Sequence, residues 1–124
     1  MRVGYVVLYV DDEEACFDFW TNKVGMELQE TSQLPDNTIY RVGFKTQTFS
    51  FELVPLEIMK ENPHELNLGT PSICFYVNSA AAERDRLIAA GITTTELMDR
   101  NGKQNFAFSD NENRWFAVLE NSGI

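Results

Sequence analysis

Apolar and polar positions alternate in a way that predicts four strands in the first half of the chain. An apolar run rich in Val and Tyr at residues 3–10 is typical of a buried strand. Shorter alternating segments follow, separated by turn-forming residues such as Pro35. These further predicted strands span residues 26–31, 38–44 and 48–54.

Between the first two predicted strands, the apolar positions change to helical spacing. Asp12 is the predicted N-cap, because the acidic residues 11–14 suit the positive end of a helix dipole better than they suit a metal site. The predicted apolar stripe consists of Cys16, Phe19 and Trp20. We expect the helix to continue to about residue 23 and to end at Gly25, a left-handed C-cap.

A linker with a different composition separates this half from the next. Residues 56–69 contain Pro63 and the only histidine, His64, which we expect to be exposed. One helical turn is predicted near residues 56–61.

The second half then repeats the same order of elements. Ser79 caps a predicted Ala-rich helix at residues 80–90, and Gly91 ends it. The predicted strands of this half span residues 71–77, 92–97, 104–109 and 114–120.

This repetition predicts an internal duplication. The two halves match in order, with Tyr9 falling on Tyr76 and Gly25 on Gly91. We expect one α+β domain over residues 1–124, built from two βαβββ modules at residues 1–55 and 70–121. One helix covers only one face of a four-stranded sheet, so the other face must be buried by something else or line a cavity.

Length, charge and cysteine content limit the function. The 124 residues suit a single domain, and ten Lys and Arg against nineteen Asp and Glu give a net charge of −9. Such an acidic surface repels nucleic acid and anionic membranes, whereas it suits a cationic small molecule. Cys16 and Cys74 are too few for a disulfide framework, and we expect both to be reduced and buried. The sequence has neither an apolar run of membrane-spanning length nor a signal-peptide pattern, so a cytoplasmic protein is expected.

Several segments, taken in order, carry a resemblance to a known superfamily. They are residues 5–12 (YVVLYVDD), 19–26 (FWTNKVGM), 51–53 (FEL), 73–77 (ICFYV) and 110–113 (DNEN). In this arrangement nearly the whole chain resembles the vicinal oxygen chelate superfamily, which includes glyoxalase I, bleomycin-resistance proteins, fosfomycin-resistance enzymes and extradiol dioxygenases. The resemblance implies paired modules that form a cup-shaped sheet, often within a homodimer.

The resemblance also implies four positions that hold a divalent ion in the metalloenzymes. Aligned with this chain, they are Tyr5, Glu52, Ser72 and Ala117. Only Glu52 is a good ligand, whereas catalytic zinc, nickel and iron sites draw on several His and carboxylate groups. We therefore expect no metal and no other cofactor, and we assign no catalytic residue.

Strand alternation divides the side chains between the two faces of each sheet. The predicted cup face carries Tyr5, Val7, Tyr9, Arg41, Ser50, Glu52, Val54, Ser72, Cys74, Tyr76, Trp115, Ala117 and Leu119. The opposite, helix-covered face is apolar throughout. Aromatic walls around a carboxylate suit an organic cation or a planar heteroaromatic compound. The candidate ligand-binding residues are Tyr5, Tyr9, Arg41, Glu52, Ser72, Tyr76, Trp115 and Ala117.

Other interpretations of these residues stay open. An ion pair between Arg41 and Glu52 would favour a neutral or zwitterionic ligand. Tyr5 would then only fill space and donate a hydrogen bond to Glu52. Trp115 would either line the cup or pack at a dimer interface.

Four functional hypotheses follow. The leading one is a metal-free, dimeric protein that binds a small organic molecule and sequesters a compound such as an antibiotic. The alternatives are a glyoxalase- or dioxygenase-like metalloenzyme with displaced ligands, an enzyme that uses Glu52 as a general base, and an interaction module whose cup is filled by its own side chains.

Overall fold

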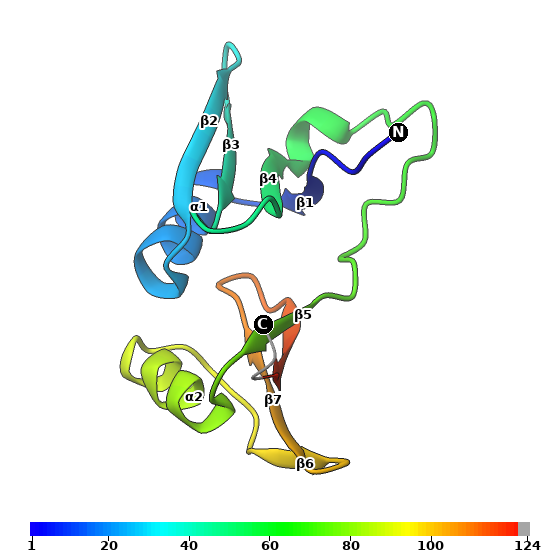
Figure 1. Cartoon of the computed structure of the whole chain (residues 1–124). Helices are drawn as coiled ribbons and strands as arrows, with labels where there is room; N and C mark the ends of the chain where they lie inside the picture. Colours follow the sequence, from blue (N-terminus) through cyan, green and yellow to red (C-terminus); the bar gives the residue numbers. More distant parts are fainter. Residues whose placement is uncertain (122–124) are drawn as a thin grey trace. The chain divides into compact units, whose positions relative to one another are not determined.

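Two four-stranded sheets, each with a helix on one face, organise the chain (Figure 1). The computed structural model describes residues 1–121. It divides into one unit spanning Met1–Pro71 and a second that begins at Ser72. The architecture is α+β, and the duplicated βαβββ order confirms the predicted fold class.

The first unit holds one sheet with strand order β1-β4-β3-β2. Its elements are β1 (Val6–Val10), α1 (Glu13–Asp18), the π-helix η1 (Phe19–Val24), β2 (Glu27–Gln33), β3 (Thr38–Gly43), β4 (Ser50–Pro55) and the 3₁₀-helix η2 (Leu56–Met59). Strand β1 runs parallel to β4, and the other neighbours are antiparallel.

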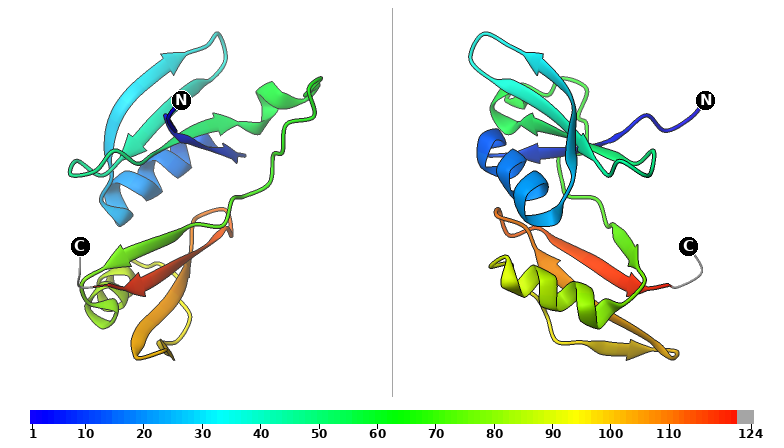
Figure 2. Two further views of the ribbon diagram at one scale, coloured as in Figure 1. Left: turned by 45° about the vertical axis from the view of Figure 1, so that its right-hand side comes forward. Right: turned by 60° about the vertical axis from the view of Figure 1, so that its left-hand side comes forward.

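The helix of this unit begins and ends where the sequence predicts. Asp12 is the N-cap, and its Oδ1 accepts a hydrogen bond of 3.0 Å from the Ala15 N–H. Gly25 ends the helical segment with φ of 106°. The stripe residue Trp20 is fully buried and packs edge-on against Phe51, with 4.9 Å between ring centroids. Helix α1 therefore covers one face of the sheet and leaves the other without a helix (Figure 2).

The second unit repeats this topology with strand order β5-β8-β7-β6. Its elements are β5 (Cys74–Val77), α2 (Ala80–Ala89), β6 (Met98–Arg100), β7 (Lys103–Ser109) and β8 (Trp115–Glu120). Ser79 caps α2 by accepting from the Ala82 N–H at 3.2 Å, as predicted. Phe108 and Phe116 are buried and stack with 5.7 Å between their ring centroids, which gives this unit an aromatic core.

The predicted strand at residues 92–97 is wrong. This segment forms only one bridge, between Thr94 and Phe108, and the edge strand β6 begins later, at Met98. The hydroxyl of Thr95 accepts from the Ala107 N–H at 2.9 Å, in the place where a strand would offer a backbone carbonyl. This side-chain bond competes with the β-ladder and interrupts it.

The linker prediction is partly confirmed. The predicted helical turn is present as η2, and residues 60–73 contain neither helix nor strand. His64 is exposed, as expected. Within residues 1–121, no helix combines the length and the apolar character needed to cross a membrane.

Candidate functional site

The face of the first sheet that α1 leaves uncovered, called here the polar face, carries the first group of candidate residues. In the strand register Glu52 of β4 lies between Val7 of β1 and Arg41 of β3, so these three side chains share one face. The neighbouring positions on the strands, such as Phe51 and Leu53, are fully buried on the other face. The predicted alternation is therefore confirmed, although Ser50 and Val54 on the polar face are themselves buried.

Three of the predicted site residues form a polar cluster on this face. The Arg41 guanidinium lies over the ring of Tyr5, 5.5 Å from its centroid. The Tyr5 hydroxyl hydrogen-bonds to Glu52, and the charge of Glu52, together with partial burial and this bond, raises the pKa of Tyr5. Tyr5 is 37% exposed, so a ligand can reach the cluster.

The partner of Arg41 differs from the predicted one. Its Nη2 lies 3.1 Å from Oε2 of Glu30 on β2, whereas Glu52 is engaged by Tyr5. The alternative prediction, an ion pair between Arg41 and Glu52, is therefore wrong, because Arg41 pairs with Glu30. Glu30 was not among the predicted site residues. Its position on the strand next to Arg41 could have predicted the contact, because opposite charges on neighbouring strands tend to pair.

A β-bulge explains the position of Glu30. Leu28 pairs with Val42, but the next paired residue is Glu30, opposite Arg41, so Gln29 is the extra residue. Strict alternation would place Leu28 and Glu30 on the same face. The bulge turns Leu28 towards the face of buried Val42 and Glu30 towards the polar face.

The corresponding face of the second sheet, called here the aromatic face, carries the remaining candidates. Ala117 of β8 lies between Cys74 of β5 and Ala107 of β7. Tyr76 and Trp115, on the same face, are 53% and 49% exposed. Phe106, Phe116 and Val118 are buried on the other face, beneath α2.

The expectation that both cysteines are buried is wrong for one of them. Cys16 is buried in the helix stripe, but Cys74 is exposed. Its apolar neighbour Phe75 faces the core, and alternation directs Cys74 to the aromatic face. An apolar stretch therefore does not bury every residue within it.

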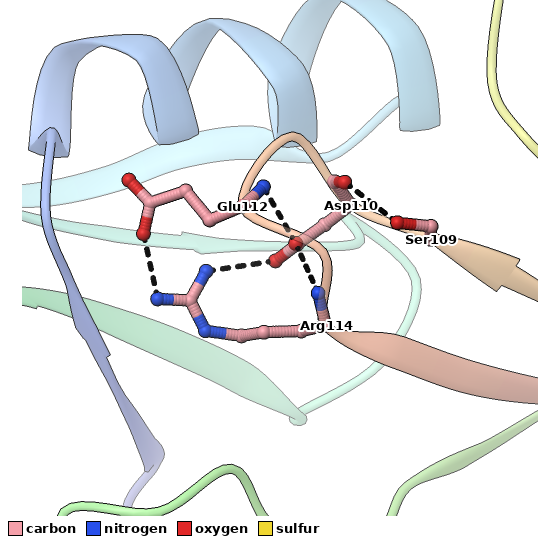
Figure 3. Close-up of polar contacts among 4 residues, drawn as sticks. All are labelled: Ser109, Asp110, Glu112 and Arg114. Atoms are coloured by element: carbon pink, nitrogen blue, oxygen red, sulfur yellow. Dashed lines mark hydrogen bonds and ion pairs between the residues drawn. The ribbon is translucent and has the colours of Figure 1, made fainter.

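A charged turn between β7 and β8 (Figure 3) directly precedes Trp115, the first residue of β8. Oδ1 of Asp110 accepts from the backbone N–H groups of Glu112 and Arg114, both at 2.9 Å. Oδ2 of Asp110 accepts from Nη1 of Arg114 at 3.0 Å, and Nη2 of Arg114 lies 2.7 Å from Oε1 of Glu112. We call these three residues the turn clasp. The sequence predicts the turn but not the clasp.

The side chains of the clasp are largely buried. The Asp110 side chain is 0% exposed and that of Arg114 is 11% exposed. Burial acts to lower the pKa of Arg114, but the hydrogen bonds and charges of Glu112 and Asp110 outweigh it, so the pKa of Arg114 is raised. The clasp fixes the start of β8, and Trp115 is the first residue of that strand.

The positions that hold metal in the superfamily do not fit a transition metal here. Tyr5 and Glu52 lie together on the polar face, Ser72 precedes β5 and is exposed, and Ala117 on the aromatic face offers only a methyl group. Among residues 1–121, no group of three or more His, Cys, Asp and Glu could hold a metal ion. A single carboxylate with a phenol and a hydroxyl is a poor donor set for zinc or iron.

Solved structures with the same fold cover nearly the whole chain. TnmS3, an antibiotic binding protein from Streptomyces sp. CB03234, is 18% identical with a TM-score of 0.79, covering 97% of this chain and 95% of that one. A superfamily member from Sphaerobacter thermophilus DSM 20745 is 20% identical with a TM-score of 0.81, covering 98% of each chain. Lactoylglutathione lyase from Agrobacterium tumefaciens is 18% identical with a TM-score of 0.73, covering 99% and 97%. At these identities the likeness shows the fold.

The family itself is shown by the sequence. Comparison with curated protein sequences gives no match. The model of the Glyoxalase/Bleomycin resistance protein/Dioxygenase superfamily, however, matches residues 2–118. The chain therefore belongs to the Glyoxalase/Bleomycin resistance protein/Dioxygenase superfamily.

Proposed function

We propose that this protein binds a small, planar organic molecule on the faces of its sheets that the helices leave uncovered, and that it does so without a metal ion. One observation carries the proposal. Of the four metal-holding positions of the superfamily, only Glu52 keeps a strong donor, while the aromatic side chains Tyr76 and Trp115 remain half exposed.

Exposed aromatic rings on a rigid sheet are suited to stacking. Rings of this size bury roughly 150–250 Å² each when fully covered and prefer offset or edge contacts with other rings. Residues Tyr76 and Trp115 stand on strands whose other faces are packed, so little conformational entropy is lost when a ligand binds. The structural neighbour TnmS3 is an antibiotic binding protein, which supports a small organic ligand for this fold.

The polar face adds hydrogen bonding and charge. The partly exposed Tyr5, Arg41 and Glu52 provide donors and acceptors close to one another. A small number of converging polar groups is what fixes the orientation of a ligand in a small-molecule site. Of the other candidates, Tyr9 shares the face of Tyr5, and Ser72 precedes the aromatic strand β5.

Isothermal titration calorimetry with planar aromatic probes of positive, zero and negative charge tests this function. We expect micromolar binding of at least one probe, and binding on the aromatic face weakened in Trp115→Ala. The matched control is Ile88→Ala, which removes an exposed apolar side chain from α2 in the same unit. Binding that is lost equally in both variants, or that is absent for every probe, would contradict the proposal.

The competing metalloenzyme function is tested on the same preparation. Metal content measured by inductively coupled plasma mass spectrometry should stay far below one ion per chain after exposure to zinc, nickel and iron salts. A stoichiometric ion that Glu52→Gln removes would favour a lyase or oxidoreductase instead. Sedimentation of the protein would separately test the expected homodimer.

A further inference from the structure

We propose that Glu30 sets the charge preference of the polar face by holding Arg41 away from Glu52, which leaves the negative charge of Glu52 available to an organic cation. This inference rests on the proposed small-molecule binding and names the class of ligand. It makes Glu30 a positioning residue that acts through Arg41.

Arg41 stands between two carboxylates in the register of the sheet. It lies opposite Glu30 on one neighbouring strand and opposite Glu52 on the other. The guanidinium is engaged by Glu30, with 3.1 Å between Nη2 and Oε2, and it rests on the ring of Tyr5. The cation is therefore drawn to the β2 side, and the carboxylate of Glu52 accepts from the neutral Tyr5 hydroxyl.

The bulge at Gln29 decides which residue faces Arg41. Continued without the extra residue, the pairing of Leu28 with Val42 would place Gln29, a neutral amide, opposite Arg41. Beside the bulge, Gly43 accepts no side chain without a shift of the backbone, because a Cβ there would lie 2.7 Å from the backbone oxygen of Phe49. The bulge therefore brings a carboxylate to Arg41 at this point.

The charges of the cluster show what Glu30 changes. Glu30, Arg41 and Glu52 together have a formal charge of −1, since two carboxylates flank one guanidinium. If Glu30 is replaced by a neutral residue, Glu52 is the carboxylate that remains beside Arg41. The Arg41–Glu52 pair then has no net charge. The partly exposed cluster would then favour uncharged ligands, because a cation gains nothing from a compensated carboxylate.

Two probes of similar planar shape and different charge test the inference. The probes are N-methylacridinium, a permanent cation, and acridine, which is neutral at pH 8. We expect Glu30→Gln to weaken N-methylacridinium binding about fivefold, the size of a coupling between partly exposed charges, and to change acridine binding less than twofold. Combining Glu30→Gln with Arg41→Met should restore most of the cation affinity, because no guanidinium is left to neutralise Glu52.

Glu27→Gln is the matched control. Glu27 lies on the same strand and the same face as Glu30, but opposite Gly43 instead of Arg41. The Glu27→Gln substitution removes the same formal charge without releasing the Arg41 guanidinium, so the affinity for N-methylacridinium should change less than twofold. An equal loss in Glu27→Gln and Glu30→Gln would overturn the inference and would leave the proposed function standing.

A second readout follows Arg41 without any ligand. The Tyr5 pKa, measured by NMR of ¹³C-labelled tyrosine with Tyr5→Phe as the assignment, should fall in Glu30→Gln as Arg41 moves beside Glu52. The fall should be smaller in the Arg41→Met background, where only the direct charge of Glu30 is removed. A Tyr5 pKa that is unchanged in Glu30→Gln would overturn the inference. If neither probe binds the wild-type protein, the inference fails, whereas the proposed function fails only if every probe of the wider calorimetric set is also without effect.

Discussion

Replacing Asp110 with alanine should cost this protein a large part of its stability. Asp110 accepts two backbone N–H bonds at the β7–β8 turn and one from the Arg114 guanidinium, and its side chain is 0% exposed. Alanine leaves both N–H groups unsatisfied and removes one of the two carboxylates that hold Arg114. Breaking a buried, hydrogen-bonded ion pair costs about 3–5 kcal/mol.

The surviving contact with Glu112 sets the size of the effect. Nη2 of Arg114 keeps its partner Oε1 of Glu112 at 2.7 Å, so the guanidinium does not lose all of its compensation. We therefore expect a loss near the lower end of that range, about 3 kcal/mol. Domains of this size are stable by roughly 5–15 kcal/mol, so the variant should fold but should unfold at much lower urea concentration.

Urea unfolding followed by far-UV circular dichroism measures this loss. Asp99→Ala is the matched control, because Asp99 also accepts a backbone N–H in a hairpin turn, from Gly102 at 2.9 Å, but Asp99 is exposed. We expect the control to cost less than about 1 kcal/mol. Asp110→Asn keeps an acceptor oxygen and loses the charge, so its loss of unfolding free energy should lie between those of Asp110→Ala and Asp99→Ala. An Asp110→Ala variant within 1 kcal/mol of the wild type would refute the reasoning.

Three further outcomes are expected. Trp115 is 49% exposed, and a ligand that covers one face of its ring would bury roughly 60 Å², so Trp115→Ala should weaken binding about tenfold in calorimetry. The hydrogen bond from Tyr40 to Glu14, with partial burial, raises the Tyr40 pKa above its ordinary value of 10.0; this stabilisation is complete below pH 10 and is lost as the pH rises through the raised pKa. Tyr40→Phe should therefore be less stable than the wild type at pH 8 by about 1 kcal/mol, and the difference should shrink above pH 11 in urea titrations. Sedimentation equilibrium at micromolar concentration should give twice the chain mass of 14.2 kDa, and a mass of one chain would contradict the predicted homodimer.

The predictable parts of the fold are those with local causes. The Asp12 and Ser79 caps and the left-handed Gly25 each depend on a few neighbouring residues, and each is found as predicted. The two faces of β4 and β8 follow from strand alternation, which is a property of a single strand. These local patterns predict the structure correctly because no contact with a distant segment changes them.

The missed features depend on contacts between distant segments. Gln29 becomes a bulge beside Gly43, and Arg41 takes Glu30 as its partner as a result. The strand predicted at residues 92–97 is displaced because Thr95 bonds through its side chain to Ala107 on β7. Neither the partner nor its distance can be obtained from the periodicity of one segment.

The duplication allows the two units to be compared position by position. The place of Glu52 on β4 is taken by Ala117 on β8, and the place of Arg41 on β3 by Ala107 on β7. The same backbone register therefore carries charges in one unit and methyl groups in the other. Under the proposed function we therefore expect a variant of Glu52 to alter the charge preference of binding on the polar face, and a variant of Trp115 to weaken stacking of planar ligands on the aromatic face.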